Sequence, residues 1–214
     1  MLITSYNSAA LGDVLIAMVA PSNRTDQAES RGDITVITQP DGTLVGVNFL
    51  AISKILDVTE WSAGQIQLDV KQVAQLNQAL QVQGFKVSLE ADLTPKFVVG
   101  YVESATKHPD SDHLQVTTTR IGNDQTVQIV SGSPNMQAGL KVVVALVGAM
   151  MPSGLVIWPG ALRGVASDGM IVSGRELRLP NAPQAKGALV LPDDFAPVGT
   201  AFDVNSNAAQ HLFD

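Results

Sequence analysis

The sequence predicts a small α+β domain followed by an all-β barrel. Residues 69–83 have the apolar spacing of an amphipathic helix, and short apolar segments bounded by turn residues precede it. After Pro95, which interrupts regular structure, only short apolar segments follow, and Gly, Pro, Asn and Asp separate them at short spacing. Many short, closely spaced strands are typical of a closed or nearly closed barrel.

The first domain is expected to span residues 1–90. Asp41-Gly42 between two apolar segments predicts a β-hairpin, and the polar residues 24–31 predict a loop. Strands are expected at residues 2–6, 14–20, 34–37 and 44–47, with one or two helical turns at 53–58.

The helix at residues 69–83 has recognisable ends. Asp69 is suited to cap its N-terminus and Gly84 to end it in the left-handed conformation. Its apolar stripe consists of Val70, Val73, Leu76 (or Ala74) and Leu80. We expect the helix to cover a sheet; a protein partner bound through residues 1–90 is the alternative. The domain has no His and no paired acids, so no catalytic chemistry is expected there.

The barrel is expected to span residues 95–203, with residues 204–214 as a polar tail. A short helical turn is expected at residues 136–139, between the third and fourth strands. Strands are expected at residues 97–102, 115–121, 127–131, 142–147, 155–158, 170–172 and 189–190.

Composition limits the class of protein. Hydrophobic residues make up 45% and charged residues 15% of the 214 residues, as in folded globular proteins. The absence of cysteine excludes disulfides and thiolate metal sites. The first residues lack a signal-peptide pattern, and no apolar segment is long enough to span a bilayer. We therefore expect a cytoplasmic protein with no membrane segment.

The net charge of −7 is unevenly distributed. Residues 1–94 contain 5 Lys and Arg against 10 Asp and Glu, whereas residues 95–203 contain 8 against 9. The acidity therefore belongs to the first half, and the barrel is nearly neutral. A nearly neutral domain can carry a local basic patch, which would support weak, salt-sensitive binding to RNA.

Three stretches carry a family resemblance: residues 108–114 (HPDSDHL), 129–135 (IVSGSPN) and 162–171 (LRGVASDGMI). They resemble, in order, the signatures of the oligonucleotide/oligosaccharide-binding (OB) tRNA-binding module. That module occurs in the bacterial phenylalanyl-tRNA synthetase beta chain, in the methionyl enzyme and in free-standing proteins of the YtpR type. The resemblance covers about half of the chain, and no synthetase ATP-binding signature accompanies it.

The resemblance implies a non-catalytic protein that recognises folded tRNA by shape and phosphate contacts, without a cofactor or a metal. The implied RNA-binding residues are His113, Asn135, Arg163, Ser167, Met170 and Arg175. Arg163 would pair with phosphate, Ser167 would offer a hydroxyl, and Met170 would offer a polarisable apolar surface. A core position for Met170 remains equally open. His113 stands where the family usually has Lys, which removes one fixed positive charge. Homo-oligomerisation is left open.

Two alternatives belong to other functional classes. Loss of RNA affinity would leave a protein-interaction barrel, which the net negative charge and His113 favour. A metal-dependent hydrolase centred on His108 and His113 is the second, because two His and two Asp lie within six residues. A serine nucleophile at Ser131 or Ser173 is not expected, because neither lies in a Gly-x-Ser-x-Gly motif.

Overall fold

The computed structural model describes all 214 residues and divides them into two compact units, Met1–Thr94 and Pro95–Asp214. The boundary falls at Pro95, which cannot donate a backbone hydrogen bond. No helix in either unit combines the length and the apolar character needed to cross a lipid bilayer.

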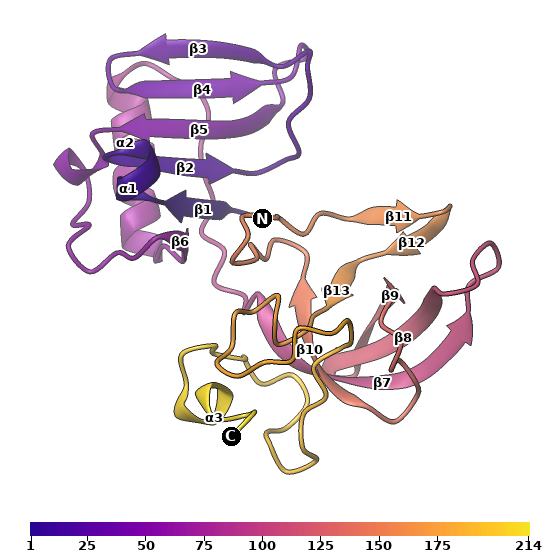
Figure 1. Ribbon diagram of the computed structural model, residues 1–214. Coiled ribbons are helices and arrows are strands. Elements are labelled where there is room, and N and C mark those ends of the chain that lie inside the picture. Colours follow the sequence, from indigo (N-terminus) through magenta and orange to yellow (C-terminus); the bar gives the residue numbers. More distant parts are fainter. The chain divides into compact units, whose positions relative to one another are not determined.

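The first unit is an antiparallel sheet of six strands (Figure 1). The order across the sheet is β3 (Gln27–Arg31), β4 (Ile34–Thr38), β5 (Leu44–Leu50), β2 (Val14–Met18), β1 (Ile3–Tyr6) and β6 (Gly64–Ile66). Two short helical segments join strands: α1 (Ser8–Leu11) and a 3-10 helix, η1 (Ile52–Lys54). Four of these strands, β1, β2, β4 and β5, lie where short apolar segments predicted strands.

The α2 helix (Val70–Val82) covers one face of this sheet (Figure 1). Its N-terminus is closed by a capping box, in which Asp69 accepts from the Gln72 backbone N–H (2.8 Å) and Gln72 accepts from the Asp69 backbone N–H (2.9 Å). Gly84 follows with a φ of 76°, as predicted for the C-terminal stop. The face turned toward the sheet consists of Val73, Leu76 and Leu80. Val70 does not share it and is 63% exposed.

The hairpin predicted from Asp41-Gly42 joins β4 and β5. The Gln39 N–H donates to the Thr43 carbonyl at 2.8 Å, and Gly42 has a φ of 89°. The Thr43 N–H also donates to the Asp41 carboxylate, and this hydrogen bond holds the pKa of Asp41 below its ordinary value. The turn is thus stabilised by both backbone and side-chain hydrogen bonds.

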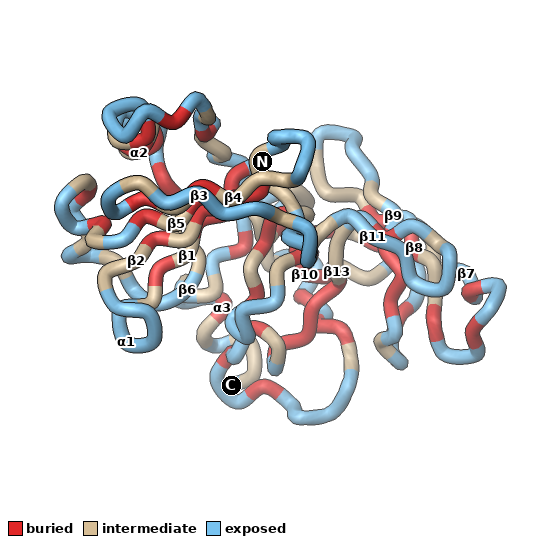
Figure 2. Tube along the Cα trace, turned by 90° about the horizontal axis from the view of Figure 1, so that it is seen from above, coloured by how far each residue is buried: buried red, intermediate tan, exposed pale blue.

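The prediction of a loop over residues 24–31 was wrong for its second half, which forms β3. All five of its residue pairs with β4 are in register, from Gln27 with Thr38 to Arg31 with Ile34. The strand is exposed along most of its length (Figure 2). An edge strand needs only backbone pairing on one side, so its polar sequence carries no apolar alternation by which it could be recognised.

The second unit contains a five-stranded antiparallel sheet that curls into a nearly closed barrel (Figure 1). The order is β13 (Gly169–Ile171), β10 (Lys141–Leu146), β7 (Phe97–Lys107), β8 (Gln115–Gly122) and β9 (Gln125–Ser131). A separate hairpin, β11 (Gly160–Leu162) with β12 (Val165–Ser167), precedes β13. This order is the OB arrangement, so the predicted fold class is confirmed.

Three hydrogen bonds join β9 to the β12–β13 segment and so bring the two ends of the sheet together. The Asp168 N–H donates to the Gln128 carbonyl at 2.9 Å, and the Gln128 side chain donates to the Ala166 carbonyl at 2.8 Å. The Val130 N–H donates to Ser167 Oγ at 3.1 Å. Closure removes the exposed edges that an open sheet would present.

The barrel has two apolar cores, one on each side of β10. Val142 and Val144 face the barrel interior with Val98, Val102 and Ile129. Val143 and Ala145 face outward, into a second core that they share with the C-terminal segment. Burial on both faces explains why this strand reads as a continuous apolar run.

Outside these strands, much of the second unit is irregular in backbone but packed. Two predicted strands, residues 155–158 and 189–190, contribute only isolated bridges, Met150 with Val156 and Val142 with Val190. The expected helical turn at residues 136–139 does not form; residues 134–135 and 138–139 are separate turns. The chain ends in α3 (Asn207–Gln210), whose Ala209 is fully buried in the outer core.

Candidate nucleic-acid interface

Arg163 lies at the tip of the β11–β12 hairpin. The two turn residues, Arg163 and Gly164, have φ values of 45° and 83°, the combination that a two-residue hairpin turn requires. An arginine in the left-handed region is uncommon, because its Cβ is crowded there. The turn therefore fixes the backbone of Arg163, and the residue is exposed.

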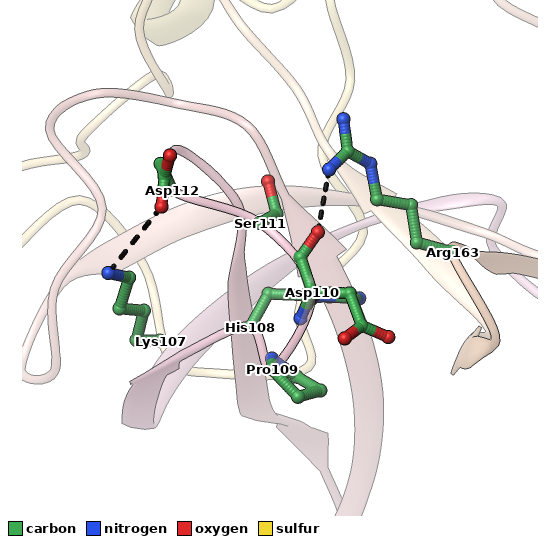
Figure 3. A pocket seen from close by; sticks show the side chains of 7 residues that line it. All are labelled: Lys107, His108, Pro109, Asp110, Ser111, Asp112 and Arg163. Carbon is green, nitrogen blue, oxygen red and sulfur yellow. Dashed lines mark hydrogen bonds and ion pairs between the residues drawn. The ribbon is translucent and has the colours of Figure 1, made fainter.

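His108 fastens this hairpin to the β7–β8 turn. Its side chain is only 1% exposed. Nδ1 accepts from the Asp110 N–H at 3.0 Å, so Nε2 carries the hydrogen and donates to the Leu162 carbonyl, also at 3.0 Å. Arg163 Nη1 adds a second link by donating to the Asp110 carbonyl at 2.6 Å (Figure 3). The turn and the hairpin are thus one connected structure.

These contacts argue against the metal-dependent hydrolase. Both ring nitrogens of His108 are engaged within the protein, and His113 is exposed, with only a marginal 3.5 Å contact to Ser111. No three His, Cys, Asp or Glu side chains are grouped to hold a metal ion. The dense His-Asp string is a strand-connecting turn, in which the buried imidazole serves as a hydrogen-bonding bridge.

The serines singled out as nucleophile candidates stabilise turns. Ser173 Oγ donates to the Glu176 carboxylate at 2.7 Å, and the Ser173 N–H donates to it at 2.8 Å. Ser131 Oγ accepts from the Ser133 N–H at 3.3 Å. The Glu176 N–H donates in turn to Ser173 Oγ, so Ser173 and Glu176 form the reciprocal pattern of a capping box. This hydrogen bonding gives Ser173 a structural role.

Two clefts flank the β11–β12 hairpin. The smaller, about 400 Å³, lies over the β7–β8 turn and is lined by Lys107, Asp110, Asp112 and Arg163 among others (Figure 3). The larger, about 490 Å³, lies between the hairpin, β13 and the segment around residue 186. We call it the hairpin cleft; its lining includes Leu155, Trp158, Leu162, Ser167, Met170, Arg175 and Lys186.

Three of the six predicted residues line the hairpin cleft. Met170 is half-buried, packed against the outer core on one side and open to the cleft on the other. Arg175 is exposed and donates through Nη1 to the Gln184 carbonyl at 3.0 Å. Ser167 is only 6% exposed, accepts from the Val130 N–H and donates to the Gly169 carbonyl. Its hydroxyl is therefore already used in closing the barrel.

The other three residues lie outside this cleft. Arg163 faces the smaller cleft, and His113 lines neither. The Asn135 amide is paired with the Ala188 backbone, donating to its carbonyl at 3.0 Å and accepting from its N–H at 2.8 Å. Asn135 thereby fixes the segment that carries Lys186 and Gly187 into the cleft wall.

Sequence reasoning missed Leu155 as a member of the site. The sequence also gave no reason to group Trp158 and Lys186 with Met170. No motif marks these positions, because they reach the cleft from an irregular loop and from the C-terminal segment.

Ser167→Ala is expected to lower the free energy of unfolding by about 1–3 kcal/mol, because the buried Val130 N–H loses its acceptor. Denaturant unfolding measures this loss, and Ser153→Ala, in an exposed loop, is the control. A loss no greater than that of the control would show that the hydroxyl is dispensable for barrel closure.

Both units are similar in sequence to known proteins. Residues 97–201 match the family model described as "Putative tRNA binding domain", and residues 21–92 match "Domain of unknown function (DUF4479)". The protein described as "Putative tRNA-binding protein YtpR" from Bacillus subtilis is 44% identical over 199 residues, covering 92% of this chain and 97% of that protein.

The other relatives are parts of larger proteins. The phenylalanine–tRNA ligase beta subunit of Neisseria meningitidis serogroup A is 43% identical over 128 residues, and that of Nitrosospira multiformis is 46% identical over 133 residues. These alignments cover 58% and 59% of this chain but 16% of each ligase subunit. A solved methionyl-tRNA synthetase related protein from Pyrococcus horikoshii aligns over 50% of this chain and 87% of its own, at 23% identity and a TM-score of 0.37.

Proposed function

Because the chain belongs to the family of the YtpR proteins with a tRNA-binding domain, we propose that it binds folded tRNA through its barrel and performs no reaction. The family membership confirms the resemblance that the three sequence stretches indicated. Recognition would rest on shape and phosphate contacts, the usual basis for binding of structured RNA.

One observation carries the proposal: the matched domain, residues 97–201, contains two clefts bordered by outward-facing cations. Arg163 and Lys107 line one cleft, and Arg175 and Lys186 line the other. Each is exposed, so phosphate oxygens can reach it. Lys107 is paired with the Asp112 carboxylate at 3.8 Å, so the positive charge of this local basic rim comes mainly from Arg163, Arg175 and Lys186.

We assign the remaining predicted residues to two roles. Met170 offers its open side to RNA. His113 is exposed and lies close in the chain to Lys107, which lines the smaller cleft. Ser167 and Asn135 hold the walls of the hairpin cleft through the hydrogen bonds described above. They support the interface rather than present free polar groups to RNA.

Binding to tRNA is expected to be weak and strongly dependent on salt. Three or four phosphate contacts, each contributing a slope of about 0.7–0.9, would lower the affinity roughly 20- to 150-fold between 50 and 200 mM salt. Titration of unfractionated tRNA at several salt concentrations measures the slope. No binding at low salt would favour the protein-interaction barrel instead.

His113→Lys is expected to strengthen tRNA binding at pH 7.5 by about two- to fivefold, because it introduces a fixed positive charge that can contact phosphate. The salt slope should become steeper at the same time. Gln81→Lys, on the exposed side of α2, controls for the change in net charge. Equal effects of the two substitutions would remove residue 113 from the interface.

A further inference from the structure

The hairpin cleft has an apolar wall that phosphate binding does not explain. Leu155 and Leu162 are 55% and 42% exposed, and both lie in this wall. Trp158 and Met170 line the same cleft and are partly exposed. Single exposed apolar residues are ordinary on a protein surface, but four gathered in one concave site indicate a ligand with an apolar face.

The polar groups of the cleft are divided between those that are free and those that are engaged. Glu176 is tied to Ser173, and Ser131 and Ser167 are buried and hydrogen-bonded. The Lys186 ammonium has no partner in the protein, and the exposed Arg175 guanidinium uses one nitrogen for the Gln184 carbonyl. Two cations therefore face one carboxylate that is already hydrogen-bonded, and the net positive charge of the lining suits an anionic ligand with an apolar part.

The walls of the hairpin cleft are held in place by contacts within the protein, so the site is preformed. His108 holds the carbonyl of Leu162, Asn135 holds the backbone of Ala188, and Met170 lies in β13, paired with Ala145. Each wall is thus fixed by contacts within the barrel. A preformed site binds with a smaller entropic cost than one that must be ordered.

Resting on the proposed tRNA binding, we propose that the hairpin cleft receives one unpaired nucleobase of the bound RNA. The base stacks on Trp158 and contacts Met170 and Leu155, and its backbone phosphate meets Lys186 and Arg175. A cleft of about 490 Å³ suits a ligand of small-molecule size. A paired helix keeps its bases stacked inside and offers mainly phosphates and 2′-hydroxyls, which would leave the apolar wall without a partner.

The chemistry of the wall also matches the general basis of single-strand recognition. Unpaired bases stack on aromatic side chains with little dependence on sequence, because every base has a π-face. Methionine adds a polarisable apolar contact that adapts to different ring shapes. The cleft should therefore require an unpaired base without strongly preferring one of the four.

Fluorescence of Trp158 tests the proposal directly. The protein has two tryptophans, so Trp61→Phe leaves Trp158 as the only one. This variant is titrated at low salt with tRNA, with a short single-stranded RNA and with a blunt-ended duplex RNA, while binding is followed separately by anisotropy of labelled RNA. We expect tRNA and the single strand to quench Trp158, and the duplex to bind without quenching it.

A matched pair of substitutions supplies the second arm. Leu155→Ala removes an exposed side chain of the wall, so the variant should fold normally. We expect about a five- to tenfold loss of affinity for the single strand. The salt slope should stay unchanged, because the substitution removes no phosphate contact and so does not alter the number of counterions released. Leu11→Ala removes an equally exposed leucine from the first unit and should change nothing.

The outcomes separate this inference from the proposed function. Salt-dependent tRNA binding that leaves Trp158 fluorescence unchanged, together with no effect of Leu155→Ala, would overturn the nucleobase cleft and leave the tRNA-binding proposal standing. Equal quenching by the duplex would overturn the requirement for an unpaired base. Absence of tRNA binding at low salt would contradict the proposed function and the inference with it.

Discussion

His108→Ala is expected to lower the free energy of unfolding by about 3–5 kcal/mol, the largest loss that we foresee for a single residue of the barrel unit. The substitution leaves a cavity at a side chain that is 1% exposed. It also removes the partners of the Asp110 N–H and the Leu162 carbonyl. Denaturant unfolding measures the loss, and the tRNA affinity of the folded variant should fall because the hairpin is no longer fastened to the turn.

His113→Ala is the matched control for this experiment, because it removes an exposed histidine from the same turn. Its free energy of unfolding should change by less than about 0.5 kcal/mol. Similar losses for the two variants would contradict the assigned bridge. His108→Gln, which retains a side-chain donor, should recover part of the stability lost in the alanine variant.

Arg163→Glu is expected to produce the largest loss of tRNA affinity, about 2–3 kcal/mol or roughly 30- to 150-fold at low salt. The substitution removes a charge-assisted phosphate contact and places a carboxylate where RNA phosphates would lie. Arg163→Ala should cost less, about 1–2 kcal/mol, and should reduce the salt slope by about one contact. Binding titrations at several salt concentrations measure both effects.

Arg178→Glu provides a close control for this charge reversal. Arg178 is also exposed, also belongs to the barrel unit and also has a positive φ, of 56° against 45° for Arg163. It lines neither cleft. Equal losses for the two reversals would show that tRNA responds only to the net charge of the protein and that Arg163 has no special position.

The α2 helix illustrates what the sequence predicted well. Its cap at Asp69, its stop at Gly84 and its buried stripe depend on residues within one or two turns of each other. Local hydrogen bonds and side-chain spacing decide such features, so the printed order of residues is sufficient to find them. The five strands of the barrel sheet were found for the same reason, apart from their ends, whereas the β11–β12 hairpin was not predicted and residues 155–158 and 189–190 form only isolated bridges.

The site was only partly predictable. The motif at residues 162–171 led to Arg163 and Met170, which lie where RNA can reach them, and to Ser167, whose hydroxyl is hydrogen-bonded inside the barrel. Exposure of a hydroxyl depends on its neighbours in space, and the neighbour of Ser167 is 37 residues away in the chain. The motif therefore pointed to a segment that borders both clefts, without distinguishing buried side chains from accessible ones.

The sequence by itself determined the two fold classes, the main helix, most strands and the family, because each depends on local patterns or on contiguous motifs. Only the tertiary structure decided that His108 is a bridge, that residues 27–31 form an edge strand, and that Leu155, Trp158 and Lys186 share a cleft with Met170. His108 and its acceptor on Leu162 are 54 residues apart. Contacts of that kind arise when the barrel closes, and closure depends on many weak interactions between residues far apart in the chain. The residues brought together in this way carry no local sequence pattern that would reveal the contact.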